Sequence, residues 1–530
     1  MRISRGGVFV AAVLAGALAL TGCTPGGSTD PGTDVIKDTL IVGKSFDLAT
    51  ADPARSFETT GGIFGRAVYD TLLTFGKGDS TTPIPMVAKS YVANDGATEY
   101  TFALRDDVVF SDGTPLTSAD VVFSFDRVKN IQGNGSFLME GLSVSAPDAN
   151  TVVITSDKPN TAIPAIITAQ TLGIVNSKVV KENGGTDAAD ASTADTAEAF
   201  LNTTSAGSGP YMLETFNTDT ETVLVANPNY WGDPAPYKKV VLKNATAENQ
   251  LTDIQSGTID IALDLGNDQL PAIASDPNLA IESSVSPTLF FLFSNANPEI
   301  SKVTSTQAFR DAVKYGIDYN GILELAGQGA QQTPGVVPSI FLGALDPSDA
   351  TVRDIDKAKA AVASLGTIPA ISLEYPSDFS VAGINFGTVA ERVQANLKEV
   401  GLEITLAPSP IATSLATYRA GTEQMGLWLW NPDYPDPADY LVFAPGNIVG
   451  LRAGWSADAN SDLVALANKA AVTTDNAERK DIYREYQLAM NEAGVFVPLF
   501  QPSASVVASK SIKGAVFSAV FGIDLTFIGK

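Results

Sequence analysis

The segment Met425 to Pro437, MGLWLWNPDYPDP, contains the side chains of this sequence that are best suited to holding a cation. An apolar strand with two tryptophans breaks at an Asn-Pro pair into a loop that carries Asp433, Tyr434 and Asp436. A carboxylate just past the end of a strand, beside aromatic side chains, suits a cationic group. Asp433 therefore has two interpretations, as the partner of such a group or as a residue that caps the turn. Asp436 is expected to have the structural role.

The sequence contains no histidine. This excludes Ser-His-Asp triads, Cys-His nucleophile pairs and His-ligated zinc sites. Neither a G-x-S-x-G nucleophile elbow nor a G-x-G-x-x-G dinucleotide fingerprint occurs. Asp253, Asp260 and Asp264 form an acidic cluster, but they lack the spacing of a calcium loop. We therefore expect no enzyme activity, no metal and no cofactor.

The charge balance is strongly acidic, with 34 Lys and Arg residues against 59 Asp and Glu residues and a net charge of −25. Binding to nucleic acid needs a basic surface, so a nucleic-acid partner is not expected. Such acidity favours solubility in the first place and attraction of cationic ligands in the second.

The first residues are typical of a secreted, lipid-anchored protein. Arg2 and Arg5 precede an apolar or small-residue run from Val8 to Leu20, and Cys23, the only cysteine, follows closely. The run would extend about 20 Å as a helix, too short to cross a bilayer, and it fits a secretory signal peptide. The sequence around Cys23 resembles the bacterial lipoprotein signal. We expect residues 1–22 to be removed and Cys23 to carry a lipid that anchors the protein on the extracytoplasmic face of the cell membrane.

Residues 23–38 are rich in Gly, Pro, Ser, Thr and Asp and are expected to form a flexible tether. Beyond them, strands and helices alternate, which predicts a mixed α/β fold with more than one lobe. Strands are expected over residues 39–43, 99–104, 150–155, 258–262, 370–375, 402–406 and 425–430. Helices are expected over residues 119–128, 247–256, 306–315, 354–365, 388–400 and 476–491, the first of them opened by a capping box, Thr117 to Asp120. The Ala/Asp/Thr-rich stretch 184–208 is expected to be a surface loop with a short helix.

A series of segments resembles the peptide, dipeptide and nickel branch, family 5, of the solute-binding proteins that serve ATP-driven importers. The strongest is Tyr100 to Val128, whose LRDDVVFSDGTPLTSADV follows the family signature LR-x-x-V-x-F-x-DG-x-PLT-x-x-DV. Shorter matches are ADPA at 51–54, VYDTLL at 68–73, GSGPY at 207–211, NPNYW at 227–231, FRDAVKYGID at 309–318, DYPDP at 433–437 and VPLF at 497–500. The resemblance runs from about residue 39 to the C-terminus.

The resemblance implies a two-lobed, periplasmic-binding-protein-like clamshell of type II, cluster C, with an extra subdomain in the first lobe. The first lobe would comprise residues 39–286 and 500–530, with the extra subdomain at 61–205, and the second lobe residues 287–499. The chain would cross between the lobes near Pro287 to Asn295 and again near Val497 to Pro502. Ligand would be enclosed between the lobes, and closure would be a hinge motion.

The resemblance also implies roles for site residues. In peptide-binding members, an Asp at the position of Asp433 pairs with the α-amino group of the ligand, and the adjoining strand offers backbone groups to the peptide. Carried over, Asp433 is the partner of the ammonium group, Leu429, Trp430 and Asn431 lie alongside the peptide backbone, and Trp430 and Tyr434 line the cleft.

The carboxylate of a peptide ligand would need a cation, and Arg419, on the helix before this strand, is the candidate. The implied function is a monomeric, lipid-anchored receptor that captures an oligopeptide or dipeptide and delivers it to the permease subunits of an ABC transporter. The same receptor role for an oligosaccharide, an opine or a metal chelate is the alternative, because the fold accepts such ligands by repacking its cleft.

Overall fold

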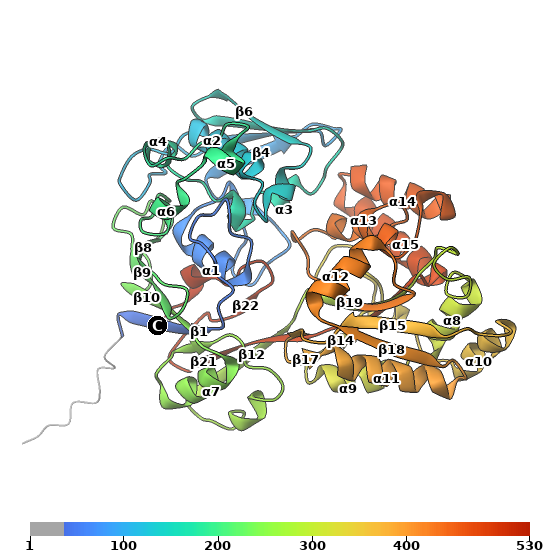
Figure 1. The fold of residues 1–530 in the computed structure, drawn as a ribbon. Coiled ribbons are helices and arrows are strands. Elements are labelled where there is room, and N and C mark those ends of the chain that lie inside the picture. Colours follow the sequence, from blue (N-terminus) through green and yellow to red (C-terminus); the bar gives the residue numbers. More distant parts are fainter. Residues whose placement is uncertain (1–36, 530) are drawn as a thin grey trace, which may run out of the picture. The chain divides into compact units, whose positions relative to one another are not determined.

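The computed structural model describes residues 37–529. The expected signal peptide, the lipidation site at Cys23 and most of the expected tether lie outside these residues. From Asp38 onward the chain forms one unit. Its sheets of seven, six and four strands are covered by helices (Figure 1), which is the mixed α/β fold that the alternating pattern predicts.

The seven-stranded sheet combines the two ends of the described chain. Its strand order is β12-β21-β11-β1-β10-β9-β8. The strands are β1 (Thr39–Lys44), β8 (Tyr211–Phe216), β9 (Glu221–Ala226), β10 (Lys239–Asn244), β11 (Ile261–Ala262), β12 (Leu279–Val285) and β21 (Ser503–Ser509). β1 pairs in parallel with β10 and β11, and β21 lies antiparallel between β11 and β12. A late strand therefore completes a sheet whose other strands all lie between residues 39 and 285.

The six-stranded sheet has the order β14-β20-β13-β19-β15-β18. Its strands are β13 (Leu289–Ser294), β14 (Gln331–Gln332), β15 (Ile371–Pro376), β18 (Ile404–Ser409), β19 (Met425–Trp430) and β20 (Phe496–Gln501). β13, with the sequence LFFLFS, is buried along its whole length because helices cover both faces of the sheet. Side chains of a strand alternate between its faces. Phe290 and Leu292 accordingly pack in one core, and Leu289, Phe291 and Phe293 pack in another.

Helices from different parts of the chain cover the two faces of this sheet (Figure 1). The helices that contribute to the first core are α8 (Gln307–Gly316), α9 (Tyr319–Ala326), α10 (Ile355–Ser364) and α11 (Phe386–Glu399). Those that contribute to the second are α12 (Ile411–Ala420), α13 (Ile448–Arg452), α14 (Ser461–Val472) and α15 (Asn476–Ala493).

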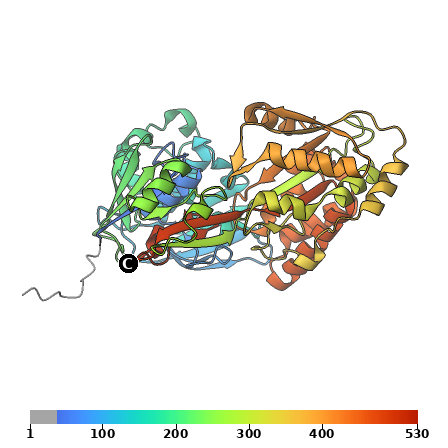
Figure 2. The ribbon, with the colours of Figure 1, turned by 90° about the horizontal axis from the view of Figure 1, so that it is seen from below.

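The chain passes between the two large sheets at two short segments, residues 286–288 and Pro502. The red C-terminal strands in Figure 2 run from one sheet into the other. The passage at residues 286–288 overlaps the start of the expected first crossing, Pro287 to Asn295, and most of the remaining range, Leu289–Ser294, is the central strand β13. The expected second crossing is likewise mostly strand β20, and only Pro502 separates it from β21.

The four-stranded sheet, of order β4-β5-β7-β6, lies in the chain between β1 and β8. Its antiparallel strands are β4 (Ala88–Ala93), β5 (Glu99–Leu104), β6 (Leu142–Asp148) and β7 (Thr151–Ser156). Helix α2 (Ser118–Ile131) shares a core with this sheet and begins with the predicted capping box of Thr117 and Asp120. The bounds that the resemblance implies for this subdomain and for the lobes stay a prediction.

The stretch 184–208, predicted as a surface loop with a short helix, is partly buried and contains two short helices. These are α5 (Ala191–Ala194) and α6 (Glu198–Leu201), and Asp195 between them is buried. Arg127 of α2 donates from Nε to Asp195 Oδ2 at 2.7 Å and from Nη1 to Asp52 Oδ1 at 2.7 Å. The two carboxylates thus pair with a fully buried guanidinium group, which ties this stretch to the core.

Candidate ligand-binding cavity

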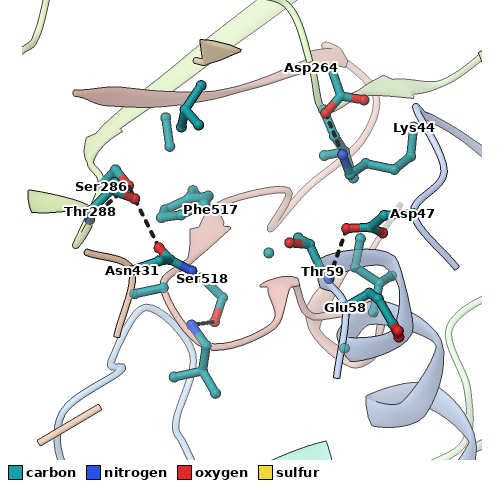
Figure 3. Close-up of a pocket in the computed structure, with 18 of the residues that line it drawn as sticks. Lys44, Asp47, Glu58, Thr59, Asp264, Ser286, Thr288, Asn431, Phe517 and Ser518 are labelled. Atoms are coloured by element: carbon teal, nitrogen blue, oxygen red, sulfur yellow. Dashed lines mark hydrogen bonds and ion pairs between the residues drawn. The ribbon is translucent and has the colours of Figure 1, made fainter. Parts of the chain in front are cut away.

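A cavity of about 940 Å³ is lined by residues that follow strands of both large sheets. Six segments contribute much of the lining: the end of β1 and the residues after it, the start of α1 (Thr59–Val68), residues 263–267 after β11, residues 379–383 at the hairpin of β16 (Ser380–Val381) and β17 (Ile384–Asn385), Leu429 with residues 431–435 at the end of β19, and the segment around residues 517–520. Further lining residues come from the start of α7 (Ala247–Ser256), from residues 286–288 and from residues 502–506. Figure 3 shows Asn431 and Phe517 on one side and Asp47, Glu58 and Thr59 on the other.

The loop after β19 is held in shape by two buried carboxylates. Asp436 opens the 3₁₀ helix η5 (Pro437–Phe443) and accepts a hydrogen bond from Arg479 Nη2 at 2.7 Å. Asp439, within that helix, accepts from the indole Nε1 of Trp430 at 2.8 Å and from the backbone N–H of Asp433 at 3.2 Å. The loop is therefore shaped by its neighbours, and the carboxylate of Asp433 is not needed for that purpose.

The carboxylate of Asp433 lines the cavity, and within residues 37–529 no hydrogen bond or ion pair reaches it. Burial raises the pKa of the Asp433 carboxyl to about 6, and the positive charge of Arg452 opposes this rise. Burial raises the pKa of the Asp439 carboxyl as well, and the negative charge of Asp433 adds to that rise. A half-buried carboxylate without a partner gains most from a ligand that brings a positive charge and N–H donors.

Asn431 lies beside Asp433 on the same wall of the cavity. Its Oδ1 accepts a hydrogen bond from Thr288 Oγ1 at 2.9 Å, and Thr288 Oγ1 in turn accepts from Ser286 Oγ at 3.0 Å (Figure 3). The amide of Asn431 is therefore oriented by the segment that joins the two large sheets, and its Nδ2 group is left for a ligand. Leu429, two residues earlier on the same face of β19, also lines the cavity.

Lys44 is the one lysine or arginine among the described residues that line the cavity, and it is already paired. Its Nζ donates to Asp264 Oδ1 at 2.5 Å (Figure 3). Asp264 Oδ2 accepts two further bonds, from the backbone N–H of Ser45 at 2.6 Å and from Gln250 Nε2 at 2.8 Å. A carboxylate of a ligand would thus have to compete for Lys44 with a well-fixed aspartate.

Two further carboxylates lie at the N-terminus of α1. Asp47 accepts from the backbone N–H groups of Thr59, at 3.1 Å, and Thr60, at 2.9 Å. Glu58 Oε2 accepts from Ser56 Oγ at 2.9 Å and from a neighbouring backbone N–H at the same distance. The free N–H groups and the positive end of the helix dipole favour anionic side chains at this position.

The sequence and fold match known proteins over nearly all of this chain. The family model described as bacterial extracellular solute-binding proteins, family 5 Middle, matches residues 82–447, more than half of the chain. The chain is a family 5 solute-binding protein. Its two-lobed, periplasmic-binding-protein-like fold is that of the family, whose members are extracellular receptors for solutes.

Individual members of family 5 resemble the chain to different degrees. The probable D,D-dipeptide-binding periplasmic protein DdpA of Escherichia coli is 30% identical over 91% of this chain and 92% of its own length. Among solved structures, the binding protein DppA from Helicobacter pylori in complex with the peptide STSA has a TM-score of 0.72 at 21% identity, covering 93% of this chain and 98% of that one. AgaA from A. tumefaciens R10 in complex with agropinic acid has the same TM-score and identity, with 92% and 98% covered. At these identities, the two structures show the fold alone.

The structure brings four of the expected site residues of this family 5 protein together around the cavity, namely Leu429, Asn431, Asp433 and Tyr434. The other two expected residues lie elsewhere. Trp430 does not line the cavity, because the alternation of β19 turns its side chain to the opposite face. Arg419 does not line it either, since it is exposed in the last turn of α12.

Tyr434 has two neighbours that connect the cavity to the rest of the fold. It lines the cavity, and it packs against the core that α2 and the four-stranded sheet share. The loop after β19 therefore contacts both the cavity and the part of the chain between β1 and β8. Asp436 has the structural role expected of it, through its bond to Arg479.

Sequence reasoning missed the lining residues from the first part of the chain, Lys44, Asp47 and Glu58. The available signal was the position of Lys44 and Asp47 directly after the predicted strand at 39–43, because sites in α/β sheets form at the carboxyl ends of strands. Their partners were not predictable, since Asp264 is 220 residues away from Lys44.

No group of three or more His, Cys, Asp or Glu side chains in the described part of the chain is placed to hold a metal ion. Among residues 37–529, no helix is both long enough and apolar enough to cross a membrane.

Proposed function

We propose that this protein is a lipid-anchored receptor that binds peptides between its two lobes and delivers them to the permease of an ABC transporter. The observation that carries the proposal is the carboxylate of Asp433, which faces a cavity of about 940 Å³ without a partner of its own in the described chain. The free α-amino group of a peptide supplies the positive charge and the N–H donors that this carboxylate lacks.

The neighbouring residues suit the rest of a peptide. Leu429 and Asn431 lie on the same wall as Asp433, and the Nδ2 group of Asn431 is free to donate to a peptide carbonyl. The volume of the cavity falls in the range of small-molecule sites and fits a short peptide. The dipeptide-binding relative DdpA and the peptide complex of DppA support this ligand class.

The anchoring and the lobe bounds complete the proposal. Residues 1–22 would direct export, Cys23 would carry the lipid, and residues 23–38 would hold the protein off the membrane. The first lobe would comprise residues 39–286 and 500–530, with the extra subdomain at 61–205, and the second lobe residues 287–499. The protein would act as a monomer.

The test is to identify what the protein binds and whether it leaves it intact. Protein purified from its own cells is denatured, and the released small molecules are analysed by mass spectrometry. Peptides with free amino termini are expected, and incubation of one of them with fresh protein should return it unchanged. Recovery of an oligosaccharide, an opine or a metal chelate instead would replace the peptide assignment, and turnover of the peptide would contradict the receptor role.

A further inference from the structure

The walls of the cavity carry far more negative than positive charge. One lysine, Lys44, faces five carboxylates, and no arginine is found among the described lining residues. The five carboxylates belong to Asp47, Glu58, Glu248, Asp264 and Asp433. A hollow lined by one sign of charge with low-dielectric walls focuses the field and concentrates ligands of the opposite sign.

The single lysine does not offset this charge for a ligand. Lys44 Nζ is bound to Asp264 Oδ1 at 2.5 Å, and the two side chains are only 14% and 22% exposed. Two more hydrogen bonds, from the backbone N–H of Ser45 and from Gln250, fix Asp264 in its place beside Lys44. Burial raises the pKa of Asp433 and the positive charge of Arg452 lowers it in part, but Arg452 does not line the cavity.

The carboxylates at the start of α1 keep their charge available to a ligand. Asp47 and Glu58 accept hydrogen bonds from backbone N–H groups and from the hydroxyl of Ser56, and these donors carry no formal charge. The helix N-terminus adds about half of a positive charge, which two carboxylates share. Figure 3 shows both side chains on the side of the cavity opposite Asn431, the neighbour of Asp433.

We propose that this cavity selects ligands of net positive charge, and that its peptides carry a lysine or arginine side chain in addition to their free amine. The inference rests on the proposed peptide-receptor function. The amine lies at Asp433, and the basic side chain lies against Asp47 and Glu58 across the cavity. The C-terminal carboxylate of the peptide has no unpaired cation to bind among the described lining residues, so its negative charge weakens binding in this acidic cavity.

The size of the effect follows from the distances that a lysine side chain can bridge. A unit charge held within roughly 7 Å of one uncompensated carboxylate, in partly solvated surroundings, changes affinity by about tenfold. We therefore expect about a tenfold gain on replacing a neutral side chain with lysine and about a tenfold loss on replacing it with glutamate. Amidation of the C-terminus, which removes a negative charge, should strengthen binding.

The experiment is calorimetric titration of the full protein with the tripeptides Ala-Lys-Ala, Ala-Gln-Ala and Ala-Glu-Ala, and with Ala-Lys-Ala amide, at pH 7.5 and two ionic strengths. Glu58→Gln keeps an oxygen to accept from Ser56 and removes one charge from the wall. Glu282→Gln removes one charge from an exposed position on β12, outside the cavity, and serves as the matched control. Thermal unfolding of both variants checks that they fold.

The expected order of affinity is Lys above Gln above Glu, with smaller differences at the higher ionic strength. Glu58→Gln should reduce the preference for Lys over Gln about threefold, and Glu282→Gln should leave it unchanged. Equal binding of the three peptides, or weaker binding of the amide, overturns the charge selection while the peptide function stands. Binding of a simple diamine, 1,5-diaminopentane, without binding of any peptide overturns the peptide function while the charge selection stands.

Discussion

Gln501 donates from its side-chain Nε2 to the backbone carbonyl oxygen of Ser286 at 2.8 Å. Gln501 ends β20 in one large sheet, and Ser286 lies just past β12 of the other. A second bond, from the backbone N–H of Ser286 to the carbonyl oxygen of Pro502 at 2.8 Å, runs between the same two segments. The two passages between the sheets are thus fastened to each other, and Ser286 continues the connection through Thr288 to Asn431 in the cavity.

Gln501→Ala should lower the free energy of unfolding by about 1–3 kcal/mol, because it leaves the buried carbonyl of Ser286 with one bond fewer. Denaturation by urea, followed by far-UV circular dichroism, measures the change. Gln331→Ala is the matched control, since Gln331 is an exposed residue opposite Gln501 on β14. A loss no larger than that of the control would show that the side-chain bond contributes nothing to holding the passages together.

The stability of the fold is expected to depend on the planar guanidinium group of Arg127, because its ion pairs are buried. Arg127 binds Asp52 through both terminal nitrogens, at 2.7 and 2.6 Å, and Asp195 through Nε and Nη2, at 2.7 and 2.9 Å. A lysine cannot make these paired bonds, so the buried carboxylates of Asp52 and Asp195 would lose charged donors. Arg127→Lys should therefore cost about 3–5 kcal/mol of unfolding free energy.

The control for this change is Arg105→Lys. Arg105 also makes a paired contact, with Asp107 at 2.8 and 2.6 Å, but both side chains are well exposed. Exposed pairs contribute about 0–1 kcal/mol, so this variant should unfold close to the wild type. Equal midpoints for Arg127→Lys and Arg105→Lys in thermal unfolding would contradict the prediction that the buried ion pairs contribute more to stability than the exposed one.

Glu423 predicts a loss of stability as the pH rises. Burial, with a smaller contribution from the charge of Glu374, raises the pKa of the Glu423 carboxyl to about 8, although the indole of Trp428 donates to it at 2.8 Å. A carboxyl whose pKa is higher in the folded state binds its proton more tightly there. Its contribution to stability is complete below the ordinary glutamate pKa and is lost as the pH rises to about 8.

Glu423→Gln keeps an acceptor for Trp428 and removes the ionisation. The wild type should lose about 1.4 kcal/mol for each unit by which the pKa is raised, relative to this variant, when urea unfolding is compared at pH 5 and pH 8.5. Glu403→Gln, at an exposed position on the turn before β18, is the control and should follow the wild type. Parallel pH profiles for wild type and Glu423→Gln would refute the prediction.

The sequence alone located several elements well because their ends carry local signals. Helix α7 has the predicted bounds, Ala247 to Ser256, since Thr246 caps its start and Gly257, with φ of 72°, ends it. Helix α11 begins at Phe386, two residues earlier than predicted, because Asn385 accepts from the N–H groups of its first turn. The strand predicted at 258–262 is limited to Ile261–Ala262, because the N–H groups of residues 258 and 259 bond back to the end of α7.

The site was predictable on one wall only. The loop after β19 is contiguous in sequence, so Leu429, Asn431, Asp433 and Tyr434 could be found together. The placement of Trp430 was wrong for a reason visible in the sequence, since a residue between Leu429 and Asn431 on a strand points to the other face. The opposite wall, at the start of α1, is more than 360 residues away, and no local pattern pairs it with this loop.

The contact between Asp433 and a peptide amine gives the sharpest test of the site. Asp433→Asn keeps the size of the side chain and removes its charge, so it should weaken a free-amine peptide by about 30-fold or more, given the usual 2–5 kcal/mol for a desolvated charge pair. Nα-acetylation of the peptide should have a similar effect on the wild type. The two changes together should cost little more than either one, because both remove the same interaction. Asp436→Asn, the matched control, should lower stability with less effect on affinity, because Asp436 binds Arg479 rather than facing the cavity alone.

Because the pKa of Asp433 is raised to about 6, the affinity for peptide should change with pH, which a purely structural role of this residue would not produce. The carboxylate is charged above this pH and protonated below it, so affinity for a free-amine peptide should increase from pH 5 to pH 7. Asp433→Asn and the acetylated peptide should both abolish this increase, because neither retains the pair of opposite charges. Calorimetric titration at the two pH values measures all four combinations of protein and peptide.

Full additivity of mutation and acetylation would place the amine elsewhere, and equal binding of both peptide forms by the wild type would point to a ligand other than a peptide. The pH dependence separates these outcomes from a general loss of fold, since a damaged cavity would bind weakly at both pH values.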